Sequence, residues 1–180
     1  NNTKVGLVTG KLRYQNGMIQ HAGITFDSQN IPYHKFEKLL KSNSDLISKE
    51  DQIIPAASGA LIFIKKALFL EIGFSEEYEI CGEDIELSLD LREKKDYIIL
   101  FSPRVSGIHF SSATRKKNNQ YGNSINDLAK MKKRREYFIN KISKNQILDE
   151  LNDLSDQVEI LKKIKLKRRK LKNFLKILRK

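Results

Sequence analysis

Two adjacent carboxylates, Glu83 and Asp84, follow Cys81 and Gly82 and open a segment of strong helix formers. A carboxylate at the start of a helix, after a flexible glycine step, can project into a cleft rather than into a core. Such a group acts as a general base if its pKa lies near the working pH. The alternative is an acidic first turn that complements the helix dipole and does no chemistry. The pair alone leaves both interpretations open.

His109 is the second candidate, 25 positions beyond Asp84 at the end of an apolar segment. Hydroxyl residues and Arg115 follow it directly, and a histidine in such surroundings can hold a phosphate or complete a metal shell. A lone histidine is also commonly structural. His21, within a strand-like segment, and His34, in a polar loop, carry weaker signals.

Three small residues, Ser58, Gly59 and Ala60, lie between Pro55 and an apolar segment. Small residues at such a place let the backbone approach a ligand closely. Tight packing of a strand against a helix explains them equally well.

Apolar patterns and turn signals predict the elements that position these residues. Two strands are predicted at 5–14 and 18–26, joined by a turn at Gln15, Asn16 and Gly17. Residues 31–50 are predicted to form a surface loop that encloses a short helix at 35–40. A strand at 53–64 and a helix at 65–72, ended by Gly73, follow.

The segment 84–94 has apolar residues at alternate positions, which by itself indicates a strand. Its helix formers, its acidic start and its basic end favour a helix instead. A buried strand at 97–101, continued by 105–109, comes next. The order strand, helix, strand predicts a layered α/β fold.

Charge divides the chain into two parts. Residues 1–115 carry 14 Lys and Arg against 15 Asp and Glu, whereas residues 116–180 carry 20 against 7. We therefore expect a near-neutral domain at 1–115 and a basic helical extension at 116–180. No apolar run approaches the roughly 20 residues of a membrane span, and no secretory signal precedes the first strand. The chain is therefore expected to be cytoplasmic, or cut from a longer protein.

Three blocks of sequence occur in a recognisable order: VGLVTGKLRYQNGMIQHAGITF, then PAASGALIFIKKALFLEIGFSEEY, then CGEDIELSLDLREKKDYIILFSPRVSGIHFSSATR. Over residues 4–115 this order resembles the C-terminal half of the family 2 glycosyltransferase catalytic domain, of the GT-A fold, including rhamnosyltransferase-like members. The resemblance implies a partial GT-A fold, which is a Rossmann-like mixed sheet with flanking helices.

The resemblance also implies a role for each candidate. Asp84 would be the catalytic base that takes the proton from the acceptor hydroxyl, with Glu83 as its supporting neighbour. His109 would lie near the donor diphosphate and its divalent cation, Mg²⁺ or Mn²⁺. The small residues at 58–60 would line the acceptor and sugar site, and Arg115 could help to neutralise the diphosphate.

Two features depart from the family pattern. Family members carry an N-terminal nucleotide-binding half that ends in an Asp-x-Asp metal motif, and these 180 residues contain no such half. Glu86 stands where many relatives have aspartate, two positions after the base. We therefore expect catalysis to require a donor-binding half from elsewhere.

The basic extension carries two helical patterns. A 4-3-4-3 spacing predicts a coiled-coil seam of about two heptads, formed by Ile147, Leu151, Leu154, Val158 and Leu161. Residues 162–180 are predicted to form a basic amphipathic helix that lies on an anionic membrane, with Leu171, Phe174, Leu175 and Leu178 on one face. A partner helix or a solvated linker are alternatives, and nucleic acid is disfavoured because Phe174 is the segment's one aromatic residue.

Together these features predict a fragment of an inverting glycosyltransferase. It would move a sugar from a nucleotide-sugar donor to a hydroxyl of a glycan or lipid-linked acceptor in cell-surface polysaccharide synthesis. It would act in the cytoplasm, peripherally at the inner membrane face. The alternative is a non-catalytic interaction module whose basic tail binds a membrane, a partner helix or nucleic acid.

Overall fold

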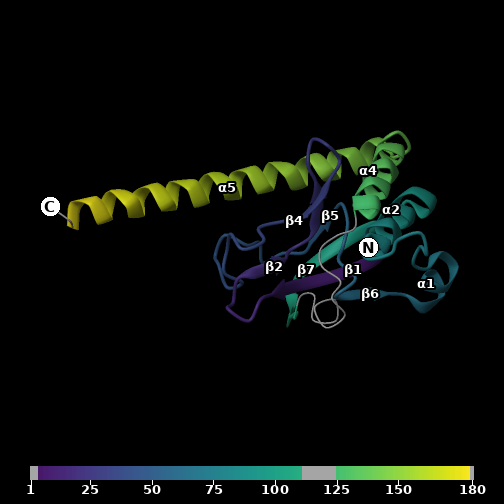
Figure 1. Ribbon diagram of the computed structural model, residues 1–180, viewed down its shortest axis with the longest axis horizontal. Helices are drawn as coiled ribbons and strands as arrows, with labels where there is room; N and C mark the ends of the chain where they lie inside the picture. The colour runs from purple at the N-terminus through teal and green to yellow at the C-terminus, as the bar shows by residue number, and fades with distance from the viewer. Residues whose placement is uncertain (1–3, 111–124, 179–180) are drawn as a thin grey trace.

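The computed structural model describes the backbone of residues 4–110 and 125–178, and side chains as far as residue 172. The fold is mixed α/β, as predicted. Figure 1 shows a curled sheet flanked by helices, with one long helix running along its upper side and beyond it. The elements are β1 (Val5–Arg13), β2 (Ile19–His21), β3 (Ile24–Phe26), β4 (Pro32–His34), β5 (Gln52–Ile54), β6 (Ile62–Ile64), α1 (Lys66–Ile72), α2 (Glu83–Lys95), β7 (Ile98–Ile108), α4 (Ile125–Ile139) and α5 (Lys144–Leu178).

The larger sheet is built around the long strands β1 and β7. Its order is β2-β1-β7-β5, and β6 also pairs with β1. β1 and β7 are parallel, whereas the other pairs are antiparallel. A shift in register after Gly10 takes the pairing from Ser102 to Ser106 and so bulges the middle of β7. β3 and β4 form a separate two-stranded sheet.

α2 has apolar side chains on both of its sides, which explains the alternating pattern in its sequence. Leu87 and Leu91 belong to the main core cluster with Leu7 and Phe101 of the sheet. Ile85 and Leu89 belong to a second cluster, together with residues of α4. The prediction of a helix is therefore confirmed, because a helix covered on two sides needs apolar residues around most of its circumference.

Three predicted elements are wrong in detail. The strand predicted at 53–64 is two short strands, β5 and β6, separated by a turn-rich segment. The strand predicted at 18–26 is split into β2 and β3 at Gly23, whose φ is 103°. The helix predicted at 35–40 is a series of turns, because Phe36 and Lys38 have φ of 58° and 54°, which a right-handed helix does not contain.

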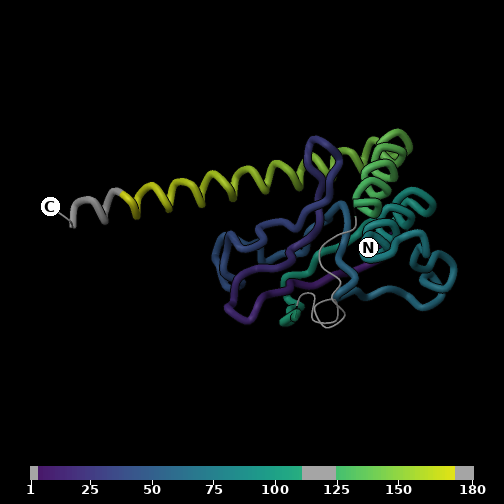
Figure 2. The backbone as a smooth tube through the Cα atoms, in the orientation of Figure 1, coloured from purple at the N-terminus to yellow at the C-terminus, as the bar shows by residue number. Residues whose placement is uncertain are grey.

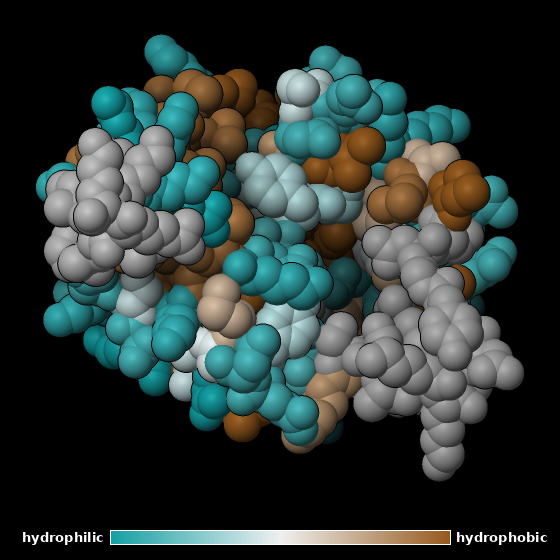
Figure 3. All heavy atoms as spheres, turned by 60° about the vertical axis from the view of Figure 1, so that its left-hand side comes forward, coloured by the Kyte–Doolittle hydropathy of each residue, from teal (hydrophilic) through white to brown (hydrophobic). Residues whose placement is uncertain are grey.

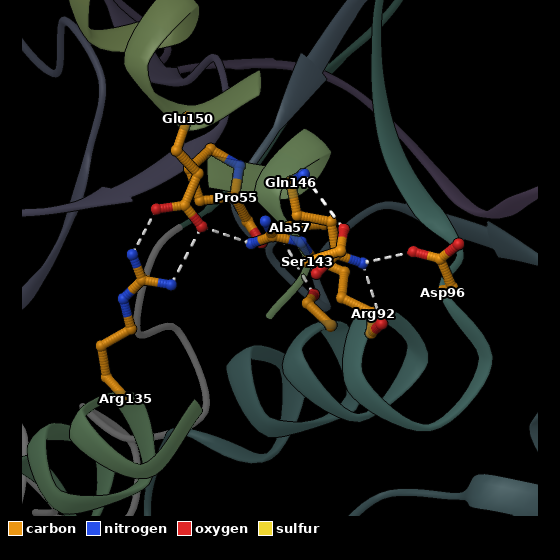
Figure 4. Close-up of polar contacts among 9 residues, drawn as sticks. Pro55, Ala57, Arg92, Asp96, Arg135, Ser143, Gln146 and Glu150 are labelled. Carbon is orange, nitrogen blue, oxygen red and sulfur yellow. Dashed lines mark hydrogen bonds and ion pairs between the residues drawn. The ribbon is translucent and has the colours of Figure 1, made fainter. Parts of the chain in front are cut away.

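α4 and the first half of α5 pack against the domain through polar side chains. Figure 4 shows Glu150 of α5 between Arg135 of α4 and Arg92 of α2. Arg92 Nη1 donates to Glu150 Oε1 at 2.6 Å and to the carbonyl oxygen of Pro55 at 3.1 Å. Arg135 donates to both oxygens of the same carboxylate. The division of the chain at residue 115 stays a prediction, but segments on its two sides share these contacts.

α5 makes further polar attachments to the domain. Gln146 donates to the carbonyl oxygen of Arg92 at 2.9 Å and to Asp96 at 3.1 Å. A fully buried ion pair joins Asp153 to Lys35. Together with Glu150, these contacts hold the first half of α5 on the domain. The ion pair of Lys167 with Asp45 is a later contact, and Figure 2 shows the end of the helix continuing past the domain.

The surface of the domain is mixed. On the face drawn in Figure 3, hydrophilic and hydrophobic side chains are interspersed. Within the described residues, no helix is both long enough and apolar enough to cross a bilayer.

Removing the Glu150 carboxylate tests how much these contacts stabilise the fold. Glu150→Leu leaves the buried guanidiniums of Arg92 and Arg135 without their counter-charge, so we expect the free energy of unfolding to fall by about 3–5 kcal/mol in urea denaturation. Glu159→Gln is the matched control on the same helix, because Glu159 is exposed and pairs only with Lys162, and it should cost less than about 0.5 kcal/mol. Equal effects of the two variants would contradict this account.

Candidate active site

Asp84 is held at the start of α2 by the turn that precedes β6. Its Oδ2 accepts a hydrogen bond from the backbone N–H of Gly59 at 2.7 Å, and its Oδ1 accepts one from the N–H of Ile85 at 2.8 Å. The side chain is half-buried, and Gly59 is exposed. The carboxylate therefore has a fixed orientation beside a surface that a substrate can reach.

Gly59 is favoured by close packing rather than by its backbone conformation. A Cβ placed on Gly59 would lie 3.2 Å from the Cβ of Asp84. Behind this contact, Ser88 accepts a hydrogen bond from the N–H of Ala57 at 3.1 Å and donates one to the carbonyl oxygen of Asp84 at 2.9 Å. Ser58 and Ala60 flank Gly59 in the same turn, so the three small residues singled out in the sequence do lie beside Asp84.

The loop before α2 is held by Asp127 of α4. Its buried carboxylate accepts hydrogen bonds from the backbone N–H groups of Glu79, Ile80 and Cys81 at 2.8–3.3 Å. Although burial acts to raise the pKa of Asp127, these three hydrogen bonds hold the pKa below its ordinary value. Asp127 thus fixes the path of the chain that leads into Glu83 and Asp84.

Glu86 is turned away from Gly59 and toward α4. Its carboxylate accepts a hydrogen bond from the Tyr78 hydroxyl at 2.5 Å and forms an ion pair with Arg134 at 3.3 Å. Burial, and then the neighbouring Glu86, raise the pKa of Tyr78 far above its ordinary value. Arg134 also binds Asp90 and Glu93 on the same side of α2. In this chain, Glu86 therefore joins α2 to α4.

His109 follows β7, and its backbone N–H donates to the carbonyl oxygen of Arg13 at 3.2 Å. His109 thus lies at the carboxyl end of the parallel pair β1 and β7, an end at which α/β sheets commonly bind ligands. The turn that binds Asp84 leads into β6, which pairs with the middle of β1 at Thr9. Asp84 is therefore nearer the middle of the two strands than His109 is.

His21 and His34, which carry weak signals in the sequence, form a close pair. His21 Nδ1 lies 3.0 Å from His34 Nδ1, and His21 Nε2 lies 3.4 Å from the Thr9 hydroxyl. That hydroxyl donates to the carbonyl oxygen of Leu61 at 2.7 Å. We therefore assign the proton of His21 to Nε2, which leaves its Nδ1 to accept a hydrogen bond from His34.

Both histidines of this pair are kept neutral. Burial lowers the pKa of His21 well below its ordinary value, and His34, Lys35 and His109 lower it further. Burial also lowers the pKa of His34; Glu37 acts to raise it, and His109 again lowers it. His109 acts on both rings through its charge, whereas His21 and His34 are in direct contact.

The described residues do not form a complete metal site. Across residues 4–110 and 125–172, no group of three or more histidine, cysteine, aspartate or glutamate side chains is arranged to hold a metal ion. His109 would therefore need ligands from elsewhere to bind a divalent cation. Arg115, expected beside the diphosphate, lies outside the described residues.

Asp127, Ser88 and Arg134 are the residues that sequence reasoning missed. Ser88 is a polar residue among the apolar positions of a buried helix, which is a weak local signal. Asp127 and Arg134 lie in the part expected to be an independent extension, and no local pattern indicates that they contact the loop and the helix carrying Asp84.

Comparison with known proteins shows what the chain is similar to. No family model matches the chain. The chain is 26% identical over 117 residues to the O-antigen biosynthesis protein RfbC of Myxococcus xanthus. The matched region covers 63% of this chain and 9% of that protein. A crystal structure of GalNAc-T7 with UDP, GalNAc and Mn²⁺ covers 76% of this chain and 33% of that one, at 18% identity and a TM-score of 0.39. The chain is similar to a protein of O-antigen biosynthesis. It spans less than a tenth of that relative's length.

Stability should depend on pH through the buried histidines. In the unfolded chain they titrate near pH about 6.5, and their lower folded-state pKa means that the unfolded state binds more protons below that pH. The free energy of unfolding should be highest above about pH 6.5 and fall as the pH is lowered, by up to about 1.4 kcal/mol per pH unit for each histidine. Urea titrations between about pH 7.5 and pH 5.5 measure this slope.

His21→Gln removes one of the two titrating groups while keeping a polar side chain. We expect it to lower the stability at neutral pH and to flatten the pH dependence. A slope as steep as that of the wild-type chain would show that acid sensitivity arises elsewhere.

Proposed function

We propose that this chain supplies the acceptor-side half of an inverting GT-A glycosyltransferase, with Asp84 as the catalytic base. The observation that carries the proposal is the Asp84 carboxylate at the start of α2, hydrogen-bonded to the backbone of the exposed Gly59 in the turn before β6. The family resemblance of the three sequence blocks around it supports the same role. A carboxylate that is oriented before substrate binds is the arrangement that general base catalysis requires.

In this reaction Asp84 takes the proton of the acceptor hydroxyl. The hydroxyl oxygen forms a bond to the anomeric carbon of the donor sugar while the bond from that carbon to the phosphate oxygen breaks. The electron pair of the broken bond leaves with the nucleoside diphosphate. Because the hydroxyl attacks from the face opposite the leaving group, the configuration at the anomeric carbon is inverted. Glu83 raises the negative potential at the base, and the turn containing Ser58, Gly59 and Ala60 lines the acceptor side.

The leaving diphosphate requires positive charge on the opposite side of the sugar. A divalent cation, Mg²⁺ or Mn²⁺, is the proposed cofactor, and it would neutralise the diphosphate when bound. His109 is the ligand that this chain offers toward it, and Arg115 is the proposed guanidinium partner. The donor-binding half would supply the remaining ligands.

The proposed product is a surface glycan. O-antigen is a bacterial polysaccharide, and similarity to a protein of its biosynthesis supports a glycan or a lipid-linked saccharide as the acceptor. Transfer of a sugar to such an acceptor would take place in the cytoplasm, at the inner face of the membrane.

Replacing Asp84 in the full-length protein tests the role of the base. We expect Asp84→Asn to lower kcat by about 10²–10⁴-fold, because the amide cannot accept the proton, with donor affinity unchanged. Asp90→Asn is the matched control on the same helix, since Asp90 pairs with Arg134, and it should change stability more than turnover. Unchanged turnover of Asp84→Asn in a sugar-transfer assay would remove Asp84 from the mechanism.

A second proposal concerns the end of α5, which we infer lies on an anionic membrane surface. Residues 162–172 contain eight Lys and Arg, and all eight are exposed. Ile164 and the ion pair of Lys167 with Asp45 hold the start of this stretch on the domain, and the helix then continues past it (Figure 2). Each Lys or Arg near an anionic bilayer contributes about 1 kcal/mol of attraction. The side chains of Phe174, Leu175 and Leu178, which complete the predicted apolar face, lie outside the described residues.

Neutralising part of this charge tests the membrane proposal without removing the contacts of Glu150. Replacing Lys163, Lys165, Arg168 and Arg169 by glutamine should weaken co-sedimentation with phosphatidylserine vesicles at least about tenfold. A control with the same loss of charge replaces the exposed Lys41, Lys49, Lys65 and Lys66, and should bind nearly as the wild type does. Equal binding of both variants, or binding to RNA but not to vesicles, would contradict the proposal.

A further inference from the structure

The first half of α5 attaches to the domain mainly through polar side chains, with Ile160 packed on the core beside them, and leaves a second, apolar stripe facing solvent. Gln146, Asp153 and Gln157 are buried against the domain and hydrogen-bonded there. The seam predicted from the sequence, hereafter the α5 seam, stays exposed, and 37–54% of each residue is accessible: Ile147, Leu151, Leu154, Val158 and Leu161. A helix that only covers the domain would carry the opposite arrangement.

We propose that the α5 seam binds the same seam of a second copy of this chain, as a parallel two-stranded coiled coil. Helices with apolar side chains at heptad spacing interlock those side chains with a partner helix that has the same spacing. The α5 seam of a second copy has this spacing, so one α5 seam can be the partner of another. Leu151 and Val158 occupy the a positions, and Leu154 and Leu161 occupy d positions, where leucine favours two parallel strands.

The position of the domain on α5 selects the parallel orientation. At 3.6 residues per turn, the α5 seam lies about 90° around the helix from the face that contacts the domain. In a parallel pair, the two-fold axis runs along the helices and places the two domains on opposite sides. In an antiparallel pair, both domains would lie on the same side of the helices, alongside one another over residues 146–167, and would collide.

The extent of the α5 seam sets the strength of the contact. Two heptads bury roughly half of the 800 Å² per partner that a standard interface buries. Lys165 and Arg168 occupy the next a and d positions, so the apolar contact ends there and like charges follow it. The dimer is therefore weak, and it becomes stronger as salt screens the two basic segments from each other.

Sedimentation equilibrium of the 180-residue chain tests the proposal. We expect a reversible dimer whose dissociation constant falls several-fold when NaCl is raised from about 0.05 M to about 0.5 M. Leu154→Glu should weaken the dimer at least about tenfold. Leu166→Glu is the matched control, because Leu166 is as exposed as the α5 seam residues (53%) but lies off that line, and it should leave the constant unchanged. A chain that stays monomeric at both salt concentrations, or equal loss in both variants, would overturn the proposal.

Cross-linking tests the orientation separately. In a background of Cys81→Ser, Ile147→Cys should form an interchain disulfide under mild oxidation, because a parallel pair places position 147 opposite itself. Leu166→Cys in the same background is the control and should stay reduced. Failure of the Ile147→Cys chain to cross-link, with dimerisation intact, would overturn the parallel arrangement.

Discussion

Much of this structure depends on one carboxylate, Glu150, and the two guanidiniums that it binds. Burial acts to raise the pKa of Glu150, but Arg135 and Arg92 lower it below its ordinary value, so the group is charged where it lies. Arg92 lies over the Phe138 ring at 4.8 Å, and Arg135 lies over Phe26 at 4.3 Å. The cost of removing three charges from water is offset here by ion pairs, hydrogen bonds and aromatic contacts. Apolar residues could fill the same space but would specify a helix orientation less sharply.

The position of the proposed base follows from this contact. Arg92 lies on the helix that Glu83 and Asp84 open, and it also binds the Pro55 carbonyl, four residues before Gly59. α4, held through Arg135, carries the Asp127 that fixes the loop before Asp84. Both segments that meet at the Asp84 carboxylate are therefore anchored through α4 and α5. The helical extension thus contributes to the geometry of the site.

The same contact also decides which side of α5 stays accessible. Because Gln146, Glu150, Asp153 and Gln157 face the domain, together with Ile160 and Ile164, the stripe formed by the α5 seam faces solvent. Polar attachment gives each side chain one set of partners and therefore one rotation of the helix about its axis. The exposed α5 seam is a consequence of that rotation.

The sequence by itself determined the elements whose patterns are local. Strong helix formers with complementary end charges predicted α2, Gly73 predicted the end of α1, and heptad spacing marked the α5 seam. It did not determine the turns at 35–40, where two non-glycine residues take positive φ, or the break between β5 and β6, because non-local hydrogen bonds decide both. Only the tertiary structure decided that Gly59 contacts Asp84 and that His21 contacts His34. It also decided that Asp127 binds the loop before α2 and that Arg134 binds α2 itself. These pairs lie 13 to 48 residues apart, and a contact over such a distance is set by how the elements pack, which no local spacing encodes.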